Sequence, residues 1–189
     1  LADILVGKVN PSGRLNVSFP RSTGNTPCFY NHFVTDREES FDQPGTPEEP
    51  KGHYIFDKPE PLWNFGHGKS YTTFDYVDCA LSDTLLVASD TLKVSVTIKN
   101  TGRRDGKEVV QLYVRDKVST VATPIQQLKA FQKVLIKPGE SQCVELSLPI
   151  AELALYNAKM EEVVEPGDFE IQIGAASDDI RFKKTITIN

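Results

Sequence analysis

The segment Leu92-Lys-Val-Ser-Val-Thr-Ile-Lys99 decides the fold of this chain. Its aliphatic residues alternate with lysine, serine and threonine, so an extended backbone would turn one apolar face to a core and one polar face to water. An amphipathic helix would instead repeat its apolar residues every three or four positions. The segment is therefore predicted to be a half-buried strand.

Similar alternation recurs toward the C-terminus, and each apolar segment is separated from the next by turn-forming residues. The segments cover residues 109–115, 131–136, 144–148, 169–173 and 182–188. Glycine, proline, asparagine and aspartate between them favour tight turns, at Asn100-Thr-Gly102, Asp105-Gly106, Lys137-Pro-Gly139 and Glu165-Pro-Gly167. About seven short strands at regular spacing predict an all-β, antiparallel β-sandwich over residues 70–189.

The first third of the chain has a different character. Residues 1–6 read as the end of an amphipathic helix that Gly7 terminates, and residues 15–19 as a short strand after a turn. From about residue 21 to 62 the apolar residues follow neither a helical nor an alternating period, so this stretch is predicted to be an irregular strap. Its apolar side chains suggest that it packs onto something; they are Phe29, Tyr30, Phe33, Phe41, Tyr54, Ile55 and Phe56.

Composition narrows the class of protein. The chain has 189 residues, of which 39% are hydrophobic and 25% charged, as expected for one well-buried domain with an appendage. The net charge of −5 leaves no basic field for nucleic acid, and no apolar run approaches the length of a membrane helix. Neither nucleic acid nor a membrane is an expected partner.

Pro61-Leu-Trp-Asn-Phe-Gly-His-Gly-Lys-Ser-Tyr-Thr-Thr-Phe-Asp-Tyr76 resembles a signature of glycoside hydrolase family 3. Residues 2–20 are similar to the segment that closes the α/β sandwich domain of that family. Further matches follow the family order at residues 111–115, 124–134, 138–141 and 165–169. The ordered set covers nearly the whole chain.

This resemblance implies the C-terminal part of a β-glucosidase or β-xylosidase. Residues 1–20 would end an α/β sandwich catalytic domain, residues 21–69 would form the linker or strap, and residues 70–189 would form an immunoglobulin-like domain of the fibronectin type III-like kind. The implied parent is a retaining enzyme that needs no cofactor or metal for catalysis and is periplasmic or secreted. Its upstream catalytic domains are the implied partner, and it would meet carbohydrate through them.

Catalysis by this chain alone is not expected. Retaining hydrolysis needs two carboxyl groups about 5 to 5.5 Å apart, and in the family both belong to motifs upstream of the matched segments. Adjacent carboxylates on a strand point to opposite faces, and in loops they are usually solvated. None of the adjacent pairs is therefore a catalytic candidate; they are Glu38-Glu39, Glu48-Glu49, Glu161-Glu162 and Asp178-Asp179.

A metal site is not expected either, because the histidines and cysteines lack the close spacing of metal ligands. These residues are His32, His53, His67, Cys28, Cys79 and Cys143. The three cysteines permit at most one disulfide, and buried free thiols are favoured.

Three signature residues are candidates for contacts at a substrate entrance or a domain junction: Trp63, His67 and Tyr71. Sugar rings stack on aromatic side chains, so a partly exposed Trp63 or Tyr71 would mark a carbohydrate contact. A buried Trp63 would instead anchor the strap to the sandwich, which is the favoured interpretation. His67 is expected to stack structurally. Lys69 stands where the family usually has leucine.

Two alternatives to a bracing accessory domain stay open. An independent carbohydrate-binding module would present a row of exposed aromatic residues, but the strand residues Tyr113, Phe131, Phe169 and Phe182 fall mostly at inward-facing positions. A protein-interaction domain would need an exposed apolar patch, which the aromatic strap supplies, and dimerisation through the strap is one form of it.

Overall fold

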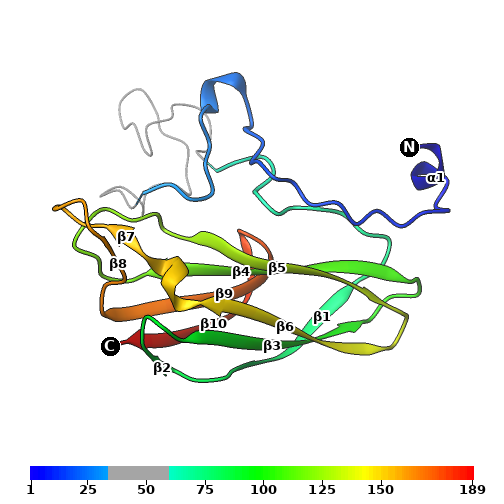
Figure 1. Cartoon of the computed structure of the whole chain (residues 1–189). Helices are drawn as coiled ribbons and strands as arrows, with labels where there is room; N and C mark the ends of the chain where they lie inside the picture. The colour runs from blue at the N-terminus through cyan, green and yellow to red at the C-terminus, as the bar shows by residue number, and fades with distance from the viewer. Residues whose placement is uncertain (34–59) are drawn as a thin grey trace, which may run out of the picture.

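The computed structural model of the chain describes residues 1–33 and 60–189 (Figure 1). The strap residues Phe41, Tyr54, Ile55 and Phe56, together with His53, Glu38-Glu39 and Glu48-Glu49, lie outside these ranges.

The described residues form two main sheets and a small hairpin. One sheet has the order β1 (Phe74–Leu81), β3 (Thr91–Asn100), β6 (Ser141–Pro149). The other has the order β2 (Leu85–Leu86), β10 (Asp179–Ile188), β9 (Gly167–Ala176), β4 (Gly106–Asp116), β5 (Gln127–Ile136). The hairpin pairs β7 (Leu155–Tyr156) with β8 (Glu162–Val163), and the helical turns are α1 (Ala2–Leu5), η1 (Thr23–Asn25) and η3 (Ile150–Leu153).

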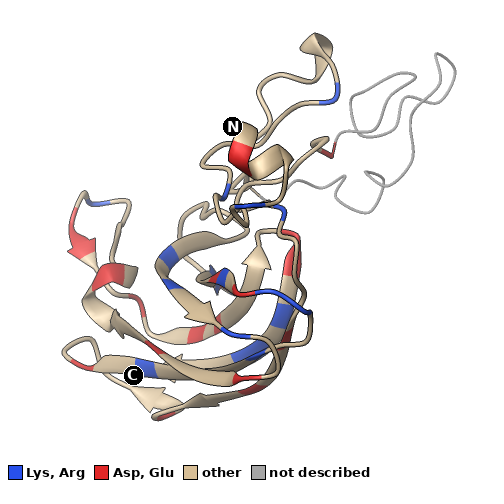
Figure 2. Ribbon diagram, turned by 90° about the vertical axis from the view of Figure 1, so that its right-hand side faces the viewer, with Lys and Arg blue, Asp and Glu red and all other residues tan. Residues whose placement is uncertain are grey.

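One hydrophobic core lies between the two main sheets. The inward residues of β3, from Leu92 to Ile98, are fully buried and belong to the same cluster as Val110, Leu112 and Val114 of β4. Figure 2 shows the strands curling around this interior, with acidic and basic residues interspersed over them. The predicted all-β class is confirmed in its coarser form, as a mostly-β structure with a few short helical turns, and so is the strand at residues 92–99. The two main sheets and the core between them are called the sandwich below.

The prediction of a wholly antiparallel arrangement is wrong at one edge, because β2 pairs in parallel with β10. Asp83 explains the local geometry: its carboxylate accepts hydrogen bonds from the backbone N–H groups of Thr84 and Leu85. The chain therefore turns before β2, and the two residues of β2 then lie beside Thr187 and Ile188.

Phe131 also departs from its predicted inward position, since 67% of its surface is exposed. It lies opposite Gln111 in the antiparallel pair of β5 with β4. Residues opposite each other in such a pair project from the same face, and Gln111 projects away from the core. Val134 and Ile136 carry the core face of β5 instead.

Residues 1–33 and 60–71, here called the N-terminal segment, run along the outer side of the five-stranded sheet (Figure 1). Helix α1 ends as predicted before Gly7, whose φ is +74°. The strand predicted at residues 15–19 is absent, because the chain bends at residues 16–17. Backbone pairing survives at its two ends, where Leu15 bonds with Gly66 and His67, and Phe19 bonds with Leu62 and Trp63.

Gly66 is predicted to be intolerant of a side chain. Its φ is +82°, and an added Cβ would overlap the side-chain oxygen of Gln111 and approach Ala176 Cα to 3.0 Å. We expect Gly66→Ala to lower the free energy of unfolding by about 3 kcal/mol, combining backbone strain with overpacking. Urea denaturation measures this change.

Gly139→Ala is the matched control, because Gly139 has a φ of +76° but nothing within 4 Å of the added Cβ. Gly139→Ala should lower the free energy of unfolding by about 1–2 kcal/mol, which is the cost of placing an alanine at a positive φ. If both variants lose the same free energy of unfolding, crowding around the added Cβ at Gly66 does not contribute to the destabilisation.

Candidate functional site

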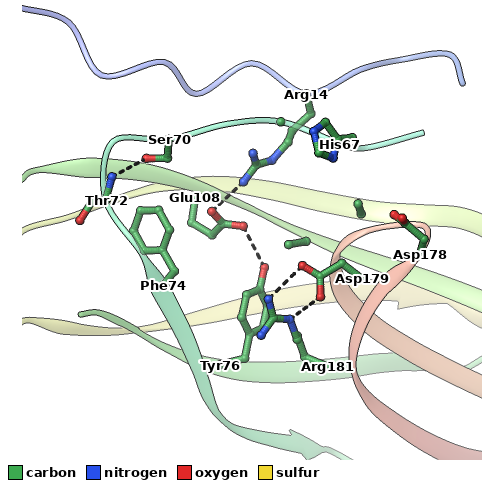
Figure 3. Close-up of a pocket in the computed structure, with 13 residues that line it drawn as sticks. Arg14, His67, Ser70, Thr72, Phe74, Tyr76, Glu108, Asp178, Asp179 and Arg181 are labelled. Atoms are coloured by element: carbon green, nitrogen blue, oxygen red, sulfur yellow. Dashed lines mark hydrogen bonds and ion pairs between the residues drawn. The ribbon is translucent and has the colours of Figure 1, made fainter. Parts of the chain in front are cut away.

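The N-terminal segment meets the sandwich at a buried ion pair between Arg14 and Glu108. The Arg14 guanidinium lies 2.7 Å from the Glu108 carboxylate, and the two side chains are 13% and 3% exposed. Glu108 lies near the start of β4, and Arg14 reaches it from a loop 94 residues earlier in the chain (Figure 3). A buried carboxylate at this position requires a cation, and the N-terminal segment supplies it.

Tyr76 of β1 completes the network around Glu108. Its hydroxyl donates to a Glu108 oxygen at 3.1 Å and lies 3.3 Å from the carbonyl oxygen of Gly174 in β9. Burial raises the pKa of Glu108, and the Arg14 charge and hydrogen bond oppose that rise. Burial also raises the pKa of Tyr76, with the Glu108 charge adding to the effect. Tyr76 is therefore a neutral hydrogen-bond donor at ordinary pH.

A cleft of about 370 Å³ opens beside this network. Asp179 and Arg181 lie on its opposite wall, paired at 2.6 Å, and the Arg181 guanidinium lies 5.7 Å from the centre of the Tyr76 ring (Figure 3). His67 and Asp178 also line the cleft, and Asp178 accepts a hydrogen bond from the Asn64 amide at 2.7 Å. Most of the charged groups in the cleft are thus already paired.

Other polar contacts hold the N-terminal segment to the sandwich. The Asn10 side chain donates to the carbonyl oxygen of Asp105 at 2.9 Å, and within the N-terminal segment it accepts from the backbone N–H of Tyr71 at 2.8 Å. Arg104 donates to the Gly7 carbonyl at 2.7 Å. Residues 7 and 10 are thus held by specific contacts with the sandwich.

Of the three predicted site residues, only His67 reaches the cleft that holds the ion pair. Trp63 is 46% exposed, so the expectation that it is a buried anchor is wrong. Its neighbour Phe19 meets it edge-on at 5.9 Å, because the two residues pair outside the sandwich. Tyr71 is also 46% exposed, and its hydroxyl donates to the Ile4 carbonyl at 2.8 Å. Whether any of the three contacts a substrate stays a prediction.

The two ion-paired carboxylates of the cleft are not placed for acid–base chemistry. Glu108 is buried and bonded to Arg14 and Tyr76, while both oxygens of Asp179 are held by Arg181. Neither carboxylate is free to attack a substrate or to exchange a proton with one. Within residues 1–33 and 60–189 there is no group of three or more potential metal ligands.

Sequence reasoning missed Arg14, Glu108 and Tyr76 as a unit. One signal was present: Glu108 immediately precedes the apolar run of β4, where a charged residue facing the core would need a partner. Nothing local identified Arg14 as that partner.

Comparison with known proteins places the chain in a family. The model of the glycosyl hydrolase family 3 C-terminal domain matches residues 1–71, and that of the fibronectin type III-like domain matches residues 108–177. A periplasmic beta-glucosidase of Salmonella typhimurium is 39% identical over 180 residues, covering 94% of this chain and 23% of that protein. A beta-xylosidase of Formosa agariphila is 40% identical over 183 residues, which cover 96% of this chain and 24% of that protein.

Solved structures agree with these matches. The beta-glucosidase from Listeria innocua in complex with isofagomine superposes with a TM-score of 0.87 at 38% identity, covering 99% of this chain and 26% of that one. The chain therefore belongs to glycoside hydrolase family 3, with a family 3 C-terminal domain sequence and a fibronectin type III-like domain. It spans about a quarter of the length of these relatives.

No helix in the described part of the chain is long and apolar enough to cross a membrane.

Arg14→Met is predicted to destabilise the fold in a pH-dependent way. Because the folded-state pKa of Glu108 is raised, its contribution to stability is complete at low pH and is lost as pH rises through that pKa. Removing Arg14 raises this pKa further and enlarges the loss. We expect a cost of about 3 kcal/mol near pH 8, shrinking toward pH 5 as Glu108 becomes protonated. Urea denaturation across this range measures it.

Two variants serve as controls. Adding Glu108→Gln to Arg14→Met should remove most of the pH dependence, since no ionisable group is left in the pair. Lys93→Met breaks an exposed cross-strand pair with Glu145 at 3.3 Å and should cost less than about 1 kcal/mol at every pH. A pH-independent cost for Arg14→Met would contradict the electrostatic role of Arg14.

Proposed function

We propose that this chain is a non-catalytic accessory region of a retaining family 3 glycosidase that braces the catalytic domains. The Arg14–Glu108 ion pair is the observation that carries the proposal. It joins a residue matched by the family 3 C-terminal domain model to a strand of the fibronectin type III-like domain. Contacts of this kind fix the orientation of the sandwich relative to the sequence that precedes it.

The proposed division of the chain rests on its resemblance to the family. Residues 1–20 would end the α/β sandwich catalytic domain, residues 21–69 would form the linker, and residues 70–189 would form the accessory sandwich. The hydrogen bonds of Asn10 with residues of the sandwich support a tight connection between the first and last of these units.

The proposed parent enzyme hydrolyses terminal β-D-glucosides or β-xylosides. Relatives named as beta-glucosidases and as a beta-xylosidase support this substrate class. In the described residues at the junction, Glu108 and Asp179 are held in ion pairs and do not form the free pair of carboxylates that retaining hydrolysis needs, which supports a structural role for this part.

Assays with chromogenic substrates test the proposal. We expect the full-length parent to hydrolyse a β-glucoside or a β-xyloside, and this chain alone to hydrolyse neither. Adding this chain to separately expressed catalytic domains should raise their melting temperature, because a partner that binds only the folded state stabilises it. Hydrolysis by the purified chain would refute the non-catalytic assignment, and an unchanged melting temperature would count against the brace.

A second candidate is self-association through exposed aromatic residues of the N-terminal segment. Phe29 and Phe33 are both more than half exposed, which favours this alternative. Sedimentation equilibrium should then show a mass that rises with protein concentration, and Phe29→Ser with Phe33→Ser should abolish the rise. A monomer at every concentration would rule it out.

A further inference from the structure

An open groove of about 410 Å³ lies beside the ion-pair cleft on the N-terminal segment. Leu15 and Trp63 supply apolar surface, while Arg14, His67 and Lys69 supply polar atoms at its margin. The groove and the ion-pair cleft share Arg14, His67 and Gly68 as lining residues, so the two spaces adjoin.

The main chain at Trp63 is held by pairing with Phe19, and the indole contacts the Phe19 ring. The backbone N–H of Phe19 donates to the Trp63 carbonyl at 2.8 Å, and that of Leu62 donates to the Phe19 carbonyl at 2.8 Å. The Phe19 ring then packs edge-on against the indole. An aromatic platform that is fixed before binding loses little entropy when a ligand stacks on it.

Three donor-bearing side chains at the groove have no partner in the part of the chain that the structure describes. Among the described residues, the Trp63 indole N–H, the His67 ring and the Lys69 ammonium make no hydrogen bond or ion pair. These side chains can therefore bond ligand hydroxyls without breaking contacts within the protein.

The charge of the groove favours an uncharged ligand. Arg14 is neutralised by Glu108 at 2.7 Å, which leaves Lys69 as the cation of the lining that has no ion-pair partner within residues 1–33 and 60–189. A single exposed ammonium is a weak basis for anion binding. An exposed indole that shares a groove with free hydrogen-bonding groups instead matches a ring that has apolar C–H faces and hydroxyl groups at its edge.

We propose that this groove is a non-catalytic saccharide-binding site in which a pyranose ring stacks on Trp63 while its hydroxyls bond His67 and Lys69. A pyranose whose hydroxyls are all equatorial presents the flattest C–H faces, so β-linked glucose and xylose units fit best. The adjoining ion-pair cleft of about 370 Å³ leaves room for a second ring. The proposal does not depend on the bracing role.

Trp63 is the only tryptophan in the chain, so its fluorescence reports on the site directly. Titration with cellobiose or xylobiose should change the emission and saturate with a Kd of about 1–10 mM, typical of small, solvent-exposed contacts. Saturation-transfer NMR, which does not depend on tryptophan, should show the same binding. Trp63→Ala should abolish the transfer, and His67→Ala should weaken binding at least several-fold.

Tyr156→Ala is the matched control, because Tyr156 is a 60% exposed aromatic residue on the separate β7–β8 hairpin. It should leave binding unchanged. Trp63→Phe retains a ring and the backbone pairing with Phe19, so it should bind more weakly than the wild type but still detectably, with an unchanged melting temperature. Absence of saturable binding to the wild type, or binding that persists in Trp63→Ala, would overturn the proposal and leave the hydrolysis and melting tests of the bracing role unaffected.

Discussion

Strand β4 is buried on both of its faces, and the arrangement of the rest of the structure depends on this. Val110, Leu112 and Val114 face the core between the sheets, while Gln111 and Tyr113 face outward beneath the N-terminal segment. Tyr113 donates to the Gln111 side chain at 2.6 Å, and Gln111 donates to the carbonyl groups of Gly66 and Ala175. A central strand with two buried faces needs cover on each side. The N-terminal segment is therefore part of the folded unit.

The position of the N-terminal segment is set at two places on this one strand. At the start of β4, Arg14 neutralises Glu108; further along, Tyr30 packs against Tyr113 at 6.0 Å and stacks on Phe65 at 4.1 Å. The Arg14–Glu108 contact is electrostatic and therefore depends on pH, whereas the Tyr30–Tyr113 contact is aromatic and does not depend on an ionised group. Because both converge on β4, the segment cannot shift along the sheet without losing one of them. The brace proposed above has its physical basis in this two-point attachment.

Sequence periodicity predicted the strands well where one face meets the core and the other meets water, as in β3 and β6. It failed for Phe131, since β5 carries apolar side chains on both faces and the pattern does not say which face is covered. The site was harder to predict, because Arg14 and Glu108 are 94 residues apart and no local pattern links them. Trp63 was misassigned because aromatic content predicts burial on average, whereas its actual position depends on pairing with Phe19.

The ion pair and the groove are coupled through the residues that they share. The groove is built from residues 13–15 and 63–69, which are distant in sequence and are held together by backbone bonds between Leu15 and residues 66–67. Arg14 lies within the first of these stretches and fastens it to β4. A ring that stacks on Trp63 and also touches Leu15 would contact both stretches and bind only when they lie together, so it would stabilise that state by mass action. Saccharide binding at Trp63 and rigidity of the junction therefore reinforce each other, although either can exist without the other.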